Sequence, residues 1–326
     1  MKLAIDVMGF ENDISEAIKA CRRFKKQYQE VKFILVGKEN EIKSRLNKSD
    51  DFQIINADDV ITMNDSPMLA VRKTNSSMYK AIELVQTNQA DGVLSAGSST
   101  CYVPITYLLL KLIDGINKPA FMPYLPTLNK KGLMLLDAGA NKQCTGDDLY
   151  QFAKMGSIYC QTIRNIDKPR VGIINIGTEI DKGFEYHREA HQLISKDKSI
   201  NFIGFVEPRD LLEGIVDIAV ADGYTGNITL KALEGGLKTI KIALKKEFKR
   251  PWNWLGAILS LGAISGLINV FDYRNNAGAF VMGLQKIAVK THGSADEQQF
   301  YSSIRMLYEA VDKKVTDHIK ESLGKK

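Results

Sequence analysis

Residues 215–227 read IVDIAVADGYTGN, and this stretch indicates the fold class. The apolar run at residues 215–220 is typical of a buried strand, and a turn follows it at Gly223. Apolar side chains then recur at helical spacing through residues 228–240. We therefore expect a strand, a tight turn and a helix, the junction at which open α/β sheets bind ligands. The start of the predicted helix should present free backbone N–H groups and a positive dipole end to an anion.

The same alternation of strands and helices extends upstream from this junction. Helices are expected at residues 14–29 and 41–46, between strands at residues 3–7, 31–36 and 52–55. Further strands are predicted at residues 92–95, 119–126, 132–137, 169–177 and 201–206. This order favours a mostly parallel sheet with helices on both faces, a three-layer α/β/α sandwich. We expect one catalytic domain over residues 1–326.

The composition is that of an ordinary globular protein, with 44% hydrophobic and 25% charged residues among 326. A net charge of +6 suits an acidic partner or an anionic membrane surface, but does not by itself indicate nucleic acid. Four cysteines lack CxxC spacing, so we expect reduced thiols in a cytosolic protein and neither a disulfide frame nor a zinc site. They are Cys21, Cys101, Cys144 and Cys160.

Two further loops resemble anion sites. The strand at residues 92–95 leads into the small residues of Ser95–Thr100, whose N–H and hydroxyl groups suit a phosphate, although a turn chosen for packing would look the same. Lys182 lies in a glycine-flanked loop after another strand, where a lysine either contacts phosphate or simply faces solvent. Arg72 and Lys73 lie near a helix start, where they either hold an anion or form a basic turn exposed to solvent. No nucleotide-binding loop motif occurs, and the His187–His191 pair lacks the metalloprotease glutamate, so no metal is expected.

Residues 251–271 form an uncharged stretch behind a basic flank at residues 245–250. Its glycines and its Pro251 argue against a transmembrane span, and a hairpin lying in one leaflet fits better. A buried helix pair or a dimer contact remains an alternative. We expect a protruding apolar helical segment at about residues 245–275. The expected membrane contacts are Trp252, Trp254, Leu255, Ile258, Leu259 and Leu261.

Ten short motifs occur along the chain in the order of one known family. They are DVMG (6–9), NSSM (75–78), SAG (95–97), LLDAGAN (135–141), MGS (155–157), PRVG (169–172), NIGTE (175–179), NFIG (201–204), DGYTGN (222–227) and HGS (292–294). Together they cover nearly the whole chain. The chain thereby resembles the PlsX family, the bacterial phosphate acyltransferases of phospholipid synthesis.

The resemblance implies that acyl–acyl carrier protein and inorganic phosphate react to give acyl phosphate and free carrier protein. It also implies a fold like that of phosphotransacetylase and isocitrate dehydrogenase, a homodimer, and a cytoplasmic protein attached peripherally to the inner membrane face. No cofactor is implied. The family's catalytic lysine and asparagine correspond to Lys182 and Asn227. Expected substrate or phosphate contacts are Ser95, Gly97, Ser98, Asp222, Thr225, Gly226 and His292.

Two motifs depart from the family pattern. Phe10-Glu11 replaces Gly-Asp near the start, and Ser98-Ser99-Thr100 replaces Asn-Thr-Gly in the second loop. Two rival functions also stay open: an acyl-CoA-dependent phosphotransacetylase-like enzyme, and an inactive membrane-bound scaffold. A basic surface should dock the acidic carrier protein, with Arg72, Lys73 and residues 245–250 as contributors.

Overall fold

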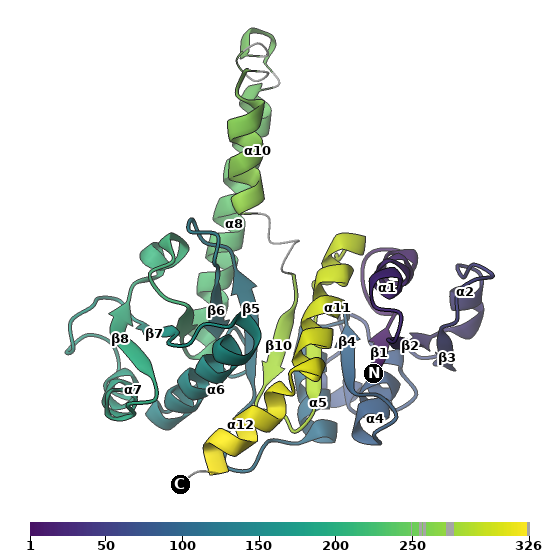
Figure 1. Cartoon of the computed structure of the whole chain (residues 1–326), viewed down its shortest axis with the longest axis horizontal. Helices are drawn as coiled ribbons and strands as arrows, with labels where there is room; N and C mark the ends of the chain where they lie inside the picture. The colour runs from purple at the N-terminus through teal and green to yellow at the C-terminus, as the bar shows by residue number, and fades with distance from the viewer. Residues whose placement is uncertain (249, 254–255, 257–258, 272–276, 325–326) are drawn as a thin grey trace. The chain divides into compact units, whose positions relative to one another are not determined.

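The computed structural model describes residues 1–248, 250–253, 256, 259–271 and 277–324 (Figure 1). Contacts within the chain define two compact units. Unit 1 comprises Met1–Pro123, Lys154–Lys168 and Arg274–Lys326, and unit 2 comprises Tyr124–Ala153 and Pro169–Tyr273. The expectation of one domain over the whole chain stays a prediction.

The sheet of unit 1 has the strand order β3-β2-β1-β4-β11-β10-β5. The first five strands pair in parallel, whereas β10 runs antiparallel to both of its neighbours. The mostly parallel sheet expected from the sequence is thus confirmed. The strands are β1 (Lys2–Asp6), β2 (Lys32–Gly37), β3 (Gln53–Asn56), β4 (Gly92–Ser95), β5 (Ala120–Leu125), β10 (Ala279–Met282) and β11 (Ile287–Lys290).

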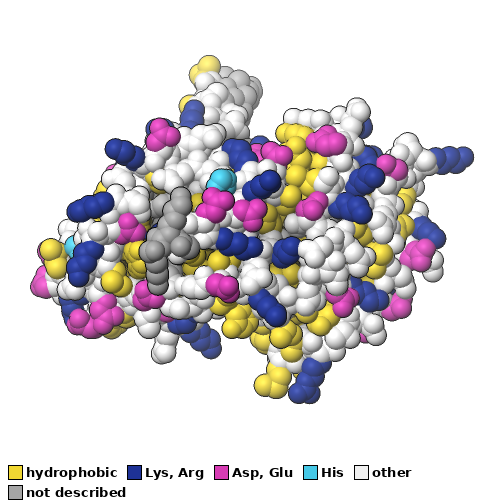
Figure 2. Space-filling model, turned by 60° about the horizontal axis from the view of Figure 1, so that its bottom comes forward, with side chains coloured by type: hydrophobic (Ala, Val, Ile, Leu, Met, Phe, Trp, Pro, Cys, Tyr) yellow, Lys and Arg dark blue, Asp and Glu magenta, His cyan; other side chains and the backbone are white. Residues whose placement is uncertain are grey.

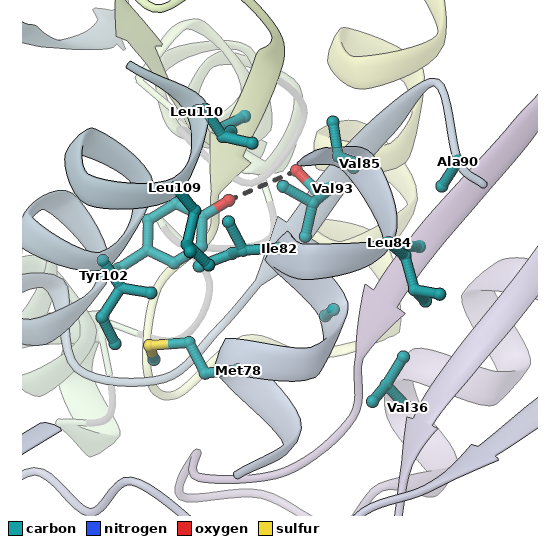
Figure 3. Close-up of a cluster of buried hydrophobic side chains, with 14 of the residues drawn as sticks. Val36, Met78, Ile82, Leu84, Val85, Ala90, Val93, Tyr102, Leu109 and Leu110 are labelled. Carbon is teal, nitrogen blue, oxygen red and sulfur yellow. Dashed lines mark hydrogen bonds between the residues drawn. The ribbon is translucent and has the colours of Figure 1, made fainter. Parts of the chain in front are cut away.

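Helices cover both faces of this sheet because alternate strand residues point to opposite sides. Ala4, Val93 and Ala288 pack with the residues of α4 and α5 in one core. Figure 3 shows Tyr102 of α5 in that core, with its hydroxyl directed at the carbonyl of Val93. On the other face, α1 and α11 lie side by side (Figure 1). The ring of Phe24 in α1 meets the ring of Phe33 in β2 edge-on.

The helices of unit 1 are mostly short. They are α1 (Ser15–Gln27), α2 (Glu39–Lys43), α3 (Pro67–Ala70), α4 (Ser77–Gln86), α5 (Ser99–Leu110), α11 (Glu297–Asp312) and α12 (Val315–Gly324). Ser76 caps α4 by accepting the N–H of Tyr79, as serines before a helix are expected to do.

Unit 2 is built on parallel strands in the order β6-β9-β7-β8. The end of β5 adds an antiparallel pairing, Tyr124 with Met134 and Leu125 with Leu133. The strands are β6 (Leu133–Leu136), β7 (Arg170–Ile174), β8 (Asn201–Val206) and β9 (Ile218–Val220), and the helices are α6 (Gly146–Arg164), which ends in unit 1, α7 (Glu185–Lys196), η1 (Pro208–Glu213), α8 (Gly223–Phe248), η2 (Pro251–Asn253) and α10 (Leu261–Val270).

Helix α8 is buried only at its start, where Gly223, Gly226 and Thr229 lie in the core. Farther along, Ile240 and Ile242 are more than half exposed, as are Trp252 and Leu259. Leu261 begins α10, but its side chain, Trp254, Leu255 and Ile258 lie outside the described residues. Among the helices described, none is both long enough and apolar enough to cross a membrane.

Most elements expected from the sequence are present within a few residues of their expected ends. The C-terminal pair β10 and β11, with α11 and α12 after them, was not among those expectations. Its strands are only four residues each and fully buried, so they show neither a long apolar run nor an alternation of polar and apolar residues.

On the face shown in Figure 2, basic and acidic side chains are interspersed.

Candidate active site

Three neighbouring parallel strands of unit 2 end at the same edge of its sheet. The segments that follow β6, β9 and β7 begin at Asp137, Ala221 and Asn175. Both residues for which a catalytic role was expected lie in these segments, since Lys182 follows β7 and Asn227 follows β9. Carboxyl ends of parallel strands are the usual ligand-binding edge of such sheets.

Asp222 closes the start of α8. One carboxylate oxygen accepts the N–H groups of Tyr224 and Thr225, each at 3.0 Å, and the Asp222 carbonyl accepts the N–H of Gly226 at 2.9 Å. The expectation that this helix start presents free N–H groups was therefore wrong for these three residues, because a buried aspartate already satisfies them. Phosphate contact by Asp222, Thr225 and Gly226 stays a prediction, and for Thr225 it would have to use the hydroxyl.

Gly226 lets α8 approach the segment after β6 closely. A Cβ atom at Gly226 would lie 1.9 Å from the Asp137 carbonyl oxygen, closer than any side chain allows. The fully buried carboxylate of Asp137 in turn accepts the N–H groups of Gly139, Ala140 and Asn141 at 2.7–3.1 Å. It also accepts the side-chain amide of Asn141 at 2.9 Å. Sequence reasoning gave Asp137 no role, although an aspartate directly after an apolar strand and two residues before a glycine was the available signal.

Asn227 lies in the first turn of α8, next to the loop that Asp137 organises. Its amide nitrogen is 3.6 Å from the position that a Cβ of Gly139 would take. The side chain is half-buried, and the structure records no hydrogen bond of its amide to any described residue. The amide N–H groups of Asn227 are therefore available to a ligand.

Lys182 lies in an exposed loop that the buried side chain of Asn175 holds in place. The Asn175 side chain donates to the Lys182 carbonyl at 3.2 Å. Gly183 follows with φ of +82°, and a Cβ there would meet the Asn175 side-chain oxygen at 2.4 Å. The Lys182 ammonium itself has no ion-pair partner within the described chain. Its charge is thus available at the strand edge.

A chain of contacts joins the Lys182 loop to the start of α8. His187 of α7 is buried and accepts the N–H of Phe184 through Nδ1 at 3.1 Å. The Tyr186 ring lies 4.2 Å from the His187 ring, and the Tyr186 hydroxyl donates to Asp222 at 3.0 Å. Burial lowers the pKa of His187, which keeps the imidazole neutral near pH 7. These contacts fix the Lys182 loop relative to the helix that carries Asn227.

Unit 1 contains the other expected phosphate contacts. Ser95, at the end of β4, donates to Asp6 at 2.6 Å and accepts the N–H of Gly97 at 3.1 Å. Ser98 precedes α5 but makes no side-chain cap, and the N–H groups of Ser99 and Thr100 have no partner among the described residues. This helix start, unlike that of α8, is open to an anion.

His292 follows β11 in the same unit. It is exposed, and its Nδ1 lies 2.9 Å from the Ser294 hydroxyl. A Cβ at Gly293 would lie 3.8 Å from the Ala96 carbonyl oxygen, so the loops after β4 and β11 are neighbours. The loop after β1 joins them because the Glu11 N–H donates to the Gly293 carbonyl at 2.8 Å.

One departure from the family pattern, Phe10, contributes to the packing of unit 1. Phe10 packs edge-on against Phe300 of α11, with ring centroids 5.1 Å apart. Of the two basic groups expected at the surface near α4, Lys73 pairs with Asp65 at 2.9 Å, whereas Arg72 is exposed. Within the described part of the chain, no group of three His, Cys, Asp or Glu side chains is placed to hold a metal ion.

The model of the family described as "Fatty acid synthesis protein" matches residues 1–318. A phosphate acyltransferase of Malacoplasma penetrans is 53% identical over 326 residues, covering 100% of this chain and 98% of that protein. A phosphate acyltransferase of Mycoplasma pneumoniae is 48% identical, covering 99% and 98%. This chain belongs to the PlsX family of phosphate acyltransferases.

Solved structures agree with this family's expected fold. A phosphotransacetylase from Streptococcus pyogenes superposes with a TM-score of 0.65 at 16% identity, covering 96% of this chain and 94% of that one. Isocitrate dehydrogenase from Methylococcus capsulatus gives 0.53 at 9% identity, covering 99% and 90%. At these identities the likeness concerns the fold, and the expected phosphotransacetylase- and isocitrate dehydrogenase-like architecture is confirmed.

Proposed function

We propose that this PlsX-family chain transfers an acyl group from acyl carrier protein to inorganic phosphate, as a step of phospholipid synthesis. A phosphate oxygen attacks the thioester carbonyl, a C–O bond forms and the C–S bond breaks. The carrier-protein thiolate leaves and takes up a proton. Phosphate is itself the nucleophile, so the protein has to position the two reactants and stabilise the oxyanion that forms.

The observation that carries this proposal is that the side chains of Lys182 and Asn227 in unit 2 have no recorded partner among the described residues. Lys182 offers an ammonium group and Asn227 offers amide N–H groups, neither used by another described residue. Both loops are held by hydrogen bonds of three buried residues, Asp137, Asp222 and Asn175. We assign Lys182 to the negative charge of the phosphate or oxyanion, and Asn227 to hydrogen bonding with the carbonyl oxygen.

The phosphate is assigned to the open start of α5 in unit 1. Ser95 and Gly97 shape this loop, Ser98 and the N–H groups after it are donors, and His292 lies in the neighbouring loop. This assignment is separate from that of Lys182 and Asn227 and is tested separately, by the KM for phosphate of Ser98→Ala and His292→Ala.

The decisive experiment incubates the full chain with palmitoyl–acyl carrier protein and labelled phosphate and measures acyl phosphate. Removing one oxyanion donor costs roughly 100- to 1,000-fold in rate, so we expect losses of that size for Lys182→Ala and Asn227→Ala. Lys142→Ala provides a lysine control in the same unit. Product from palmitoyl-CoA but not from the carrier protein would favour the acyl-CoA enzyme, and no product from either donor would favour the scaffold.

The partners expected from the sequence are also proposed here. We assign peripheral membrane contact to the segment around Trp252 and Leu259, whose side chains are 83% and 81% exposed, next to exposed Lys245 and Lys246. Sedimentation with anionic liposomes should fall when Trp252 is changed to Ser and Leu259 to Asp.

The proposed homodimer should have twice the chain mass in light scattering. Carrier-protein docking at Arg72 predicts a salt-sensitive KM that Arg72→Glu raises.

A further inference from the structure

Three neighbouring strands of unit 1 place a row of polar side chains at the same level of the sheet. Asp6 ends β1, Ser95 ends β4 and Lys290 ends β11, and both Asp6 and Lys290 are in register with Ser95. Their side chains therefore point to one face, the face that α4 and α5 cover. All three are buried, with exposed fractions of 1%, 0% and 4%.

The row supports two loops that lie beside the open start of α5. Asp6 accepts the Ser95 hydroxyl, and Ser95 accepts the Gly97 N–H, which shapes the loop after β4. Lys290 donates to the Ala96 carbonyl of that loop at 3.5 Å, and also to the carbonyl of Thr291 in the loop that leads to His292. One buried ammonium group thus links both loops.

A buried lysine is costly, and the cost indicates a role for its charge. Burial lowers the pKa of Lys290 to about 7, while the nearby Asp6 carboxylate opposes that change. A methionine would fill the same space without the desolvation cost. The hydroxyl of the adjacent Thr291 is also buried and has no partner among the described residues. Burial thus disfavours the positive charge at this position, and the Asp6 carboxylate partly offsets that effect.

We propose that Lys290 is a positioning residue that sets the affinity of unit 1 for a tetrahedral dianion. It does so by joining the loops after β4 and β11 and by placing a positive charge beneath them. This inference rests on the proposed function in taking phosphate as the physiological anion. Lys290 itself has no assigned contact with a substrate and acts through the two loops that it joins.

The groups that face Lys290 determine the expected pH dependence. Asp6 on β1 has its pKa raised to about 6 by burial, so it is mostly ionised at pH 7. Tyr102 on α5 donates to the Val289 carbonyl next to Lys290, and burial raises its pKa well above 10, so it stays neutral. Ser77 on α4 and Ser95 on β4 are uncharged. Loss of the Lys290 proton is therefore the main charge change above pH 7.

The test uses the full chain and inorganic sulfate, which keeps two negative charges across this range, with inorganic phosphate as the second probe. Binding is read from the anion-dependent rise in Tm at several pH values from about 6.5 to about 9. The variants are Lys290→Met, Asp6→Asn and the double variant. Lys286→Met is the matched control because Lys286 lies just before the same strand and bonds to Asn88 at the surface.

We expect Lys290→Met to weaken sulfate and phosphate binding about tenfold at pH 6.5, and Lys286→Met to leave both unchanged. Wild-type sulfate affinity should fall as the pH rises through the pKa of Lys290, and this fall should be smaller in Lys290→Met. Asp6→Asn should move that fall to lower pH, because Asp6 favours the charged lysine. A residue with a merely structural role would not move this profile.

Equal sulfate affinity in Lys290→Met and the wild type, or no sulfate binding by the wild type, overturns the proposal. If Lys290→Met does not fold, the double variant replaces it and must bind sulfate more weakly than Asp6→Asn; equal binding overturns the proposal too. The acyl-transfer assay separates the two levels of inference. Wild type that binds sulfate through Lys290 but makes no acyl phosphate refutes only the proposed function.

Discussion

Changing Asp137 to Asn is the sharpest test of how the site in unit 2 is built. The Asp137 carboxylate is fully buried and accepts at least four hydrogen bonds from described residues, at least two at each oxygen. An asparagine keeps the shape but replaces one oxygen with an NH₂ group. In either orientation, two donors then face another donor. We therefore expect the loop through Gly139 to lose its hydrogen-bonded form.

The expected cost follows from that count. A buried donor left without an acceptor costs roughly 1–3 kcal/mol, so two such donors cost roughly 2–6 kcal/mol. This is a large part of the total stability of a typical protein, about 5–15 kcal/mol. Because Gly139 lies beside Asn227, the same change should displace the Asn227 amide and reduce kcat as well as stability.

Urea unfolding followed by circular dichroism, with acyl-phosphate formation measured in parallel, provides the assay. Asp181→Asn is the control because Asp181 is exposed in the same unit, and a surface change of this kind stays within about 0.5 kcal/mol. Stability of Asp137→Asn within that margin of the wild type would show that the Asp137 hydrogen bonds do not hold the loop. So would full kcat in a destabilised variant, since it would separate the loop from Asn227.

Three further changes test the contacts around Lys182. Gly183→Ala combines a positive φ with a Cβ 2.4 Å from the Asn175 oxygen, so we expect about 2–5 kcal/mol of destabilisation, measured by urea unfolding, and a lower kcat. Tyr186→Phe removes one hydrogen bond to Asp222, and kcat should fall while Tm changes little; Tyr224→Phe, on an exposed side chain, should change neither. His187→Asn tests pH dependence through Tm at several pH values. Since burial lowers the pKa of His187 below 6.5, the unfolded chain takes up the proton first as the pH falls below about 6.5, and the wild type should lose stability there. The variant retains an acceptor for the Phe184 N–H but should lack this component; an equal loss of Tm in both would contradict the assignment.

The order of strands and helices in the first 227 residues was predictable because each strand is a short apolar run that ends at a small or polar residue. Residues 215–227 illustrate this: they form β9, a turn and the start of α8, as the pattern indicates. The positions of Lys182 and Asn227 at strand ends also follow from local sequence. Whether that helix start is free or capped does not follow, since Asp222 can face a ligand or its own backbone.

The fold class and the loops that carry the candidate residues follow from local sequence, because periodicity and glycine turns act over a few neighbouring residues, and the family follows from the order of the ten motifs. Which buried groups support those loops becomes apparent only in the folded chain. Asp6, Ser95 and Lys290 are 89 and 195 residues apart along the chain and become neighbours through strand register. Register depends on the packing of both sheet faces together, so no local pattern contains it. Two other contacts also depend on tertiary packing: the close approach of Gly226 to the Asp137 carbonyl and the hydrogen bond from Tyr186 to Asp222.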